Sequence, residues 1–161
     1  MNYYKIILVV MLLLSSCKDG RNQPAVNGVD FFKVNETALS EIVAELKSHP
    51  AIRRVDKQLS RKYIDKYDDF NEDSEKAFDR IERLIADMNI ENVYVARAGA
   101  KVGGEIISIS FTLDSRGPAN SSGGYCSIDY IPSIGLVDNL ISRGREIHKL
   151  KEDWFFVVAR N

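Results

Sequence analysis

Histidine and cysteine are scarce in this chain of 161 residues, which has two of each. A zinc site needs three or four ligands that converge, usually with two of them close together in the sequence. His49 and His148 are 99 residues apart, and neither has a second ligand at the spacing that would place both on one helical face. We therefore expect no metal site.

Two common signatures of bound phosphate and of serine catalysis are also missing. The glycines between Gly99 and Gly104 lack the Gly-Lys-Ser/Thr ending of a phosphate-binding loop, and a predicted strand follows them where that loop requires a helix. No Gly-x-Ser-x-Gly elbow of a serine hydrolase is present. We therefore predict no cofactor and no catalytic residue from a motif.

Charge of either sign is not in excess, because 22 basic residues stand against 23 acidic ones, for a formal net charge of −1. A nucleic-acid-binding protein usually carries a clear basic excess. The composition therefore argues against a nucleic-acid partner.

Cys126 and His148 would form a thiolate pair if the strand over 125–131 and the last hairpin were neighbours. Cys126 falls on the same face of a predicted strand as Ile128 and Tyr130, and cysteine is among the most frequently buried residue types. An inert thiol in the core is the favoured interpretation, and the catalytic pair is the alternative.

A single long apolar run opens the chain, from Ile6 to Leu14, after one lysine at position 5. Its nine residues are too few to cross a bilayer, which takes about 20. A basic start, an apolar centre and small residues at the end are the three parts of a secretory signal. A permanent transmembrane helix and a signal peptide without lipid attachment are the two alternatives.

The end of this run, Leu-Ser-Ser-Cys at residues 14–17, resembles the lipobox of bacterial lipoproteins. The resemblance covers the first 17 residues alone and implies that residues 1–16 are removed, that Cys17 receives a diacylglycerol thioether, and that its new amine is acylated. Lipid on Cys17 would then anchor the protein in the bacterial cell envelope. Because Lys18 follows the cysteine and Asp19 comes one position later, the family's sorting rule implies the outer membrane, facing the periplasm, in a Gram-negative source.

The remainder of the chain predicts an α+β domain. Residues 17–34 are polar and rich in Gly, Asn and Pro, which predicts a flexible tether, and residues 35–161 form the predicted globular domain. Apolar residues at helical spacing predict helices over 36–47, 51–67 and 72–88, with Asn35 as the N-cap of the first. For residues 51–67 a strand is the less favoured alternative. Alternating apolar residues then predict strands. The result is N-terminal helices packed on an antiparallel sheet of about four to five strands, with a short helix over 133–144.

The second predicted helix is basic and the third is acidic, with net charges of +4 over 51–66 and −4 over 72–91. Arg53, Lys57 and Arg61 would form one row on the basic helix. The favoured interpretation is that the two helices neutralise each other. The alternative is that Arg53, Lys57 and Arg61 face anionic lipid or an acidic partner.

Two classes of function remain. We favour a membrane-anchored, non-catalytic binding or interaction module of the envelope, such as an assembly factor, an inhibitor or an immunity-type protein. It would be a monomer, attached to the membrane through Cys17, with a protein partner in the envelope. The alternative is a surface-tethered hydrolase whose site has no sequence signature.

Overall fold

The computed structural model describes residues 27–56, 71–99, 104–115 and 124–159. They form three helices and one six-stranded antiparallel sheet, which confirms the α+β class and adds a strand to the four or five expected. The helices are α2 (Gly28–Ser48), α3 (Glu72–Asp87) and α4 (Ile134–Ser142). The strands are β1 (Arg54–Asp56), β2 (Asn92–Arg97), β3 (Ile106–Ser115), β4 (Tyr125–Tyr130), β5 (Glu146–Lys151) and β6 (Trp154–Ala159), in the spatial order β1-β2-β3-β4-β6-β5.

Helix α2 begins at Gly28, earlier than the sequence predicts. Residues 28–34, assigned to the tether, form its first two turns, and the N-cap is Asn27, whose side chain accepts a hydrogen bond from the Val29 amide at 3.1 Å. Asn35, the predicted cap, lies inside the helix and donates to the Phe31 carbonyl at 2.9 Å. The apolar stripe extends this far back because Phe32 and Gly28 are buried on the same side as the later core residues.

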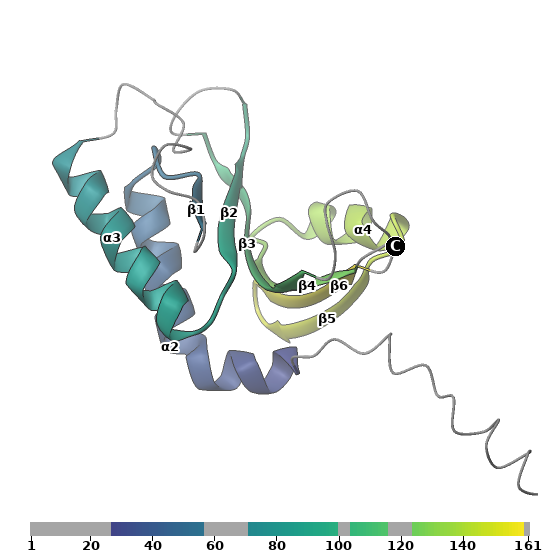
Figure 1. Cartoon of the computed structure of the whole chain (residues 1–161). Coiled ribbons are helices and arrows are strands. Elements are labelled where there is room, and N and C mark those ends of the chain that lie inside the picture. Colours follow the sequence, from purple (N-terminus) through teal and green to yellow (C-terminus); the bar gives the residue numbers. More distant parts are fainter. Residues whose placement is uncertain (1–26, 57–70, 100–103, 116–123, 160–161) are drawn as a thin grey trace, which may run out of the picture.

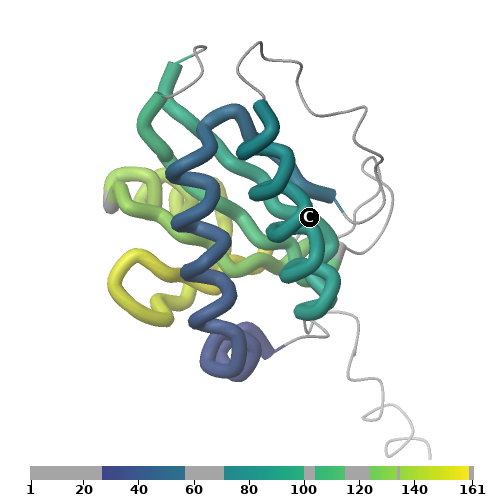
Figure 2. Tube along the Cα trace, turned by 90° about the vertical axis from the view of Figure 1, so that its left-hand side faces the viewer, coloured from purple at the N-terminus to yellow at the C-terminus, as the bar shows by residue number. Residues whose placement is uncertain are grey.

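Helix α3 confirms the third predicted helix. Asn71 caps it by accepting a hydrogen bond from the Ser74 amide at 2.9 Å, and the predicted apolar face is turned to the core. Figure 2 shows α2 and α3 side by side over the sheet. Arg80 of α3 forms an ion pair with Glu45 of α2. The contact between the two helices therefore uses one of the few basic residues of the acidic helix α3.

The predicted helix over 51–67 is wrong where the structure describes it. Residues 54–56 form β1, which pairs with β2 so that Val55 lies opposite Val93, and the Val95 amide donates to the Arg53 carbonyl at 2.8 Å. Ile52 and Val55 have a spacing that fits one face of a helix, but the open edge of β2 offers backbone partners that the sequence pattern does not reveal. Arg53 therefore does not start a helical row, while Lys57 and Arg61 lie outside the described residues.

The sheet has a core on each face. One face packs against α2 and α3, and α4 covers the other face where β6 runs, as the two sides of the sheet in Figure 1 show. All six residues of β6 are buried, and five of them belong to a core: Trp154, Phe156 and Val158 to the first, and Phe155 and Val157 to the second. A strand that is covered on both faces reads as a continuous apolar run, as Trp-Phe-Phe-Val-Val-Ala does.

Candidate functional site

Polar side chains follow the second face of the sheet over β1 to β4, on the side away from α2 and α3. The printed register sets Arg54 opposite Tyr94, Tyr94 opposite Ser110, and Ser110 opposite Asp129, which makes one row across four strands. A second row, parallel to the first, runs from Asp56 through Asn92 and Thr112 to Ser127. We call these eight residues the polar face: Arg54, Asp56, Asn92, Tyr94, Ser110, Thr112, Ser127 and Asp129.

The polar face ends where α4 begins to cover the sheet. Continued onto β6, the two rows reach Phe155 and Val157, which pack with Val137 of α4 in the second core. Exposure accordingly falls along the first row, from Arg54 at the edge strand to Asp129 beside the α4 core. The face thus has an open end on β1 and β2 and a buried end on β4.

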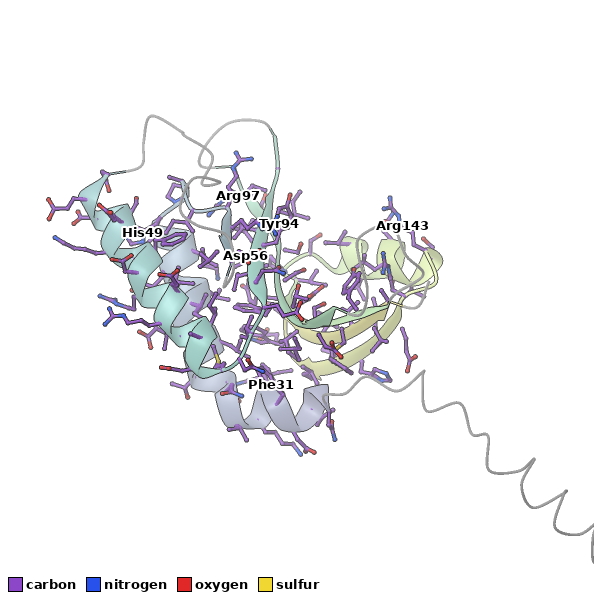
Figure 3. All side chains as sticks on the ribbon, viewed as in Figure 1. Phe31, His49, Asp56, Tyr94, Arg97 and Arg143 are labelled. Atoms are coloured by element: carbon purple, nitrogen blue, oxygen red, sulfur yellow. The ribbon has the colours of Figure 1, made fainter. Side chains whose placement is uncertain are left out.

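Tyr94 is the most prominent side chain of the open end. It is 54% exposed in the middle of β2, and Figure 3 shows it on the opposite side of the sheet from α3. Its cross-strand neighbour Arg54 donates from Nη2 to Asp56 Oδ2 at 2.7 Å and forms an ion pair with it. An aromatic ring beside an arginine on an open, polar sheet face is a composition typical of protein interfaces.

Asp129 occupies the buried end and is 6% exposed. Burial raises the pKa of its carboxyl from an ordinary value of 3.8 to about 6, while the hydroxyls of Ser127 and Ser110 and the charge of Arg145 oppose that rise. The Ser127 hydroxyl lies close enough to lower the pKa of Asp129, yet it does not reach hydrogen-bonding geometry. Among the described residues, Asp129 Oδ1 and Ser127 Oγ both lack a hydrogen-bond partner.

Such a pair of buried polar atoms requires an explanation, because each buried donor or acceptor without a partner costs about 1–3 kcal/mol. Asp129 Oδ1 can accept a hydrogen bond, and Ser127 Oγ can donate or accept one. Both atoms belong to the polar face but are buried, so a donor could satisfy them only if the groups that cover them moved aside.

Tyr125 and Arg145 flank the buried end. Tyr125 is 38% exposed at the start of β4, and the Arg145 guanidinium lies 5.0 Å from the centre of its ring, within the range of a cation–π contact. Arg145 also acts on the pKa of Asp129. Arg145 therefore places a positive charge near the buried carboxylate and packs on the ring of Tyr125, which lies further along β4.

The structure does not bring the predicted nucleophile and base together. Cys126 is 2% exposed on β4 and lies opposite Val158, whereas His148 is on β5 opposite Phe156. With β6 between them, the two strands are roughly 10 Å apart, since neighbouring strands are separated by about 4.8 Å. His148 Nε2 instead lies 3.0 Å from Glu146 Oε1.

The other residues singled out in the sequence divide into two groups. Cys17, Lys57 and Arg61 lie outside the described residues. Arg53 lies just before β1, next to Arg97, whose Nη2 donates to the Leu46 carbonyl at 2.6 Å. Burial, together with the neighbouring charge of Arg53, lowers the pKa of Arg97. Arg97 thus caps the C-terminal end of α2, and Figure 3 shows it at the end of the molecule opposite Phe31.

The polar face was not predicted from the sequence. The alternation of Cys126, Ile128 and Tyr130 with Ser127 and Asp129 predicts correctly that the two polar residues turn away from the main core. A strand pattern cannot show, however, that Asp129 is buried beside the second core, which α4 forms with β6. The raised pKa of Asp129 follows from that burial.

Within the described ranges, no group of three potential ligands is placed to hold a metal ion. Over the same ranges, no helix combines the length and hydrophobicity that a bilayer crossing requires. Compared with known protein families, curated proteins and solved structures, the chain gives no match.

Proposed function

We propose that this protein is a lipid-anchored, non-catalytic binding module of the bacterial cell envelope, and that it binds a protein partner through the polar face. The observation that carries the proposal is Tyr94, a half-exposed tyrosine in the centre of a row that ends at a buried carboxylate with an unmade hydrogen bond. The lipobox-like residues 14–17 support the anchor and the envelope location, with the outer membrane as the first expectation.

The chemistry of the polar face specifies the kind of partner. Tyr and Arg are the residue types that most often dominate binding energy at interfaces, and Tyr94 and Arg54 lie side by side. At neutral pH the buried Asp129 is ionised and needs a donor, and a lysine or arginine of the partner would supply a charge-assisted hydrogen bond. We therefore expect a protein partner that presents a basic side chain to the β4 end of the face.

Replacing Tyr94 with alanine is expected to weaken partner binding roughly 30-fold, which corresponds to a loss of about 2 kcal/mol at an interface hot spot. Tagged protein is used to capture partners from envelope extracts, and proteins retained by the wild type but lost by Tyr94→Ala are quantified. Ile141→Ala is the matched control, because Ile141 is also 54% exposed but lies on α4. If Tyr94→Ala captured the same proteins in the same amounts as the wild type, Tyr94 would not be part of the interface.

Replacing Cys17 with serine is expected to abolish lipidation and membrane retention, because the thiol is the attachment point that the lipobox implies. A clickable fatty acid fed to the producing cells reports lipidation, and fractionation reports retention. Cys126→Ser is the matched control and should keep the label, since Cys126 is buried in the core. Label that persists on Cys17→Ser, or that is lost from Cys126→Ser, would refute the anchor.

A tethered hydrolase is the second candidate, and the raised pKa of Asp129 favours it. A carboxyl that titrates near pH 6 is suited to general acid–base work, and the hydroxyls of Ser110 and Ser127 are its neighbours. Turnover of a generic ester by the purified domain, lost in Asp129→Asn, would support this candidate. Binding without turnover supports the binding module.

A further inference from the structure

Strand β5 forms one end of the sheet, with β6 as its one neighbour among the described strands. The ladder between β4 and β6 shows which backbone groups of β6 remain for β5. The Ile131 amide donates to the Asp153 carbonyl at 2.7 Å, so these two residues form a hydrogen-bonded pair at the end of that ladder. Bonded and non-bonded pairs alternate along an antiparallel ladder, so Phe155 and Val157 also bond to β4.

The backbone groups on the outer edge of β5 follow from this alternation. Phe156, between the two residues that bond to β4, directs its amide and carbonyl to β5, where it lies opposite His148. Ile147 and Lys149 flank His148, and each therefore directs one donor and one acceptor away from the sheet. In the part of the chain that the structure describes, no hydrogen bond uses the backbone of Ile147 or Lys149 on that side.

The charged side chains of β5 are matched within the fold, with one exception. Glu146 lies 3.0 Å from His148, and Lys151 forms an ion pair with Glu36 of α2. Lys149 is exposed and has no ion-pair partner among the described residues. A cation without a partner thus lies beside open backbone groups.

Ile147 and Lys149 share one face of the sheet, the face that carries the second core. Ile147 is half-buried and packs against that core, and Lys149 lies opposite Phe155, which belongs to it. A strand added beside β5 would place one side chain next to Ile147 and another next to Lys149 on this same face. An apolar side chain beside Ile147 would extend the second core, and a carboxylate beside Lys149 would pair with its charge.

We propose that the outer edge of β5 is a second docking surface, which takes an extended antiparallel strand of a protein partner with an acidic residue opposite Lys149 and an apolar residue opposite Ile147. Main-chain hydrogen bonds to an exposed sheet edge supply the binding, and side chains at alternate positions supply the selectivity. Because the added strand is antiparallel, its acidic residue comes two positions before the apolar one. The inference rests neither on the lipid anchor nor on the polar face.

Charge disfavours a second copy of this chain as the added strand. Antiparallel registers that join the outward groups of two β5 strands set odd-numbered residues opposite each other. In the three registers with the most overlap, Lys149 lies opposite a second Lys149, Arg145 or Ile147, which means like charges or an apolar side chain. Lysine on an exposed edge commonly prevents such pairing between copies, and here the same lysine favours an acidic strand.

The test uses the full-length protein in detergent micelles and two capped peptides that differ at one position, Thr-Glu-Thr-Val-Thr and Thr-Lys-Thr-Val-Thr. Titration followed by NMR should show several-fold tighter binding of the glutamate peptide. The amides of Ile147 and Lys149 should become protected from hydrogen exchange in the complex. Lys149→Glu should reverse the preference between the peptides. Lys76→Glu is the matched control and should leave the preference unchanged, because Lys76 is exposed on α3.

A second pair of variants tests the direction of the backbone groups. Lys149→Pro removes an outward amide hydrogen, so it should abolish peptide binding and keep the fold, since proline is tolerated on the open side of an edge strand. His148→Pro removes an amide hydrogen that faces β6 and should disrupt the β5–β6 hairpin. The reverse order of effects would show that the outward groups were assigned to the wrong residues.

Each remaining outcome contradicts the proposal in a different way. Binding that leaves the amides of Ile147 and Lys149 unprotected would place the peptide elsewhere, and no binding of either peptide would mean that the edge takes no such strand. Equal affinity for the two peptides would show that Lys149 does not select an acidic residue. Protection of both amides that increases with protein concentration, without peptide, would assign the edge to a contact between two copies.

Discussion

Trp154→Ala is expected to lower the free energy of unfolding by about 3–5 kcal/mol, the usual cost of deleting a large buried aromatic side chain. The indole joins three elements of the fold: Phe32 of α2 at 5.3 Å, Phe111 of β3 at 5.9 Å and Tyr130 of β4 at 5.4 Å. Tilted and edge-to-face ring pairs at these distances add to the stability beyond the area that they bury. Removing the indole leaves all three rings without their common neighbour.

Denaturant unfolding of the unlipidated domain measures this change, with an unaltered slope showing that the unfolded state is comparable. Ile141→Ala is the control, because an exposed side chain on α4 should change the stability by no more than about 0.5 kcal/mol. A change of similar size for both variants would mean that Trp154 does not hold the aromatic cluster together.

The parts of the fold that the sequence predicts are those with a long, uninterrupted pattern. Helix α3 keeps one apolar face for about three turns, from Ala77 to Met88, and its capping residue precedes it directly. Apolar and polar residues alternate along most of β3, so its pairing and its buried face follow from this period of two. Local preference and tertiary packing agree in these elements, which explains why they can be predicted from a single sequence.

The prediction is wrong where tertiary contacts decide the structure. Strand β1 has three residues, and its apolar Val55 fits a helix equally well until the open edge of β2 supplies backbone partners. The start of α2 depends on Gly28, which reads as part of a tether in the sequence but packs against Phe156, more than 120 residues later. Neither contact leaves a periodic signal in the chain.

The candidate site was missed for a related reason. Tyr94 is an exposed residue of a strand, and Ser110 and Asp129 look like the solvent side of two others. Their relation is set by the register, which places them in one row, and by the burial of Asp129 at the end of that row beside the second core. A buried acid without a full set of hydrogen bonds lowers stability, and such costs are typical of positions that serve a function.

Asp129→Asn is therefore expected to stabilise the domain at neutral pH, by up to about 3 kcal/mol. The pKa of Asp129 is raised from 3.8 in the unfolded chain to about 6 in the fold, and each pH unit of that difference is worth about 1.4 kcal/mol. Between these pH values the unfolded chain gives up the proton while the folded domain keeps it. Wild-type stability from this group therefore falls as the pH rises from about 4 to 6, and stays low above 6.

The variant has no proton to lose at this position, so its advantage over the wild type should be close to zero at pH 3.5 and reach its full size by pH 7. Unfolding measured across this range tests the sign directly, and a wild type that is the more stable of the two at pH 7 would contradict it. The same variant should bind the envelope partner more weakly, because the neutral amide can accept a hydrogen bond from a basic side chain but cannot form an ion pair with it. A domain that is more stable yet binds more weakly would show that the carboxylate of Asp129 is kept for recognition, since the fold is better without it.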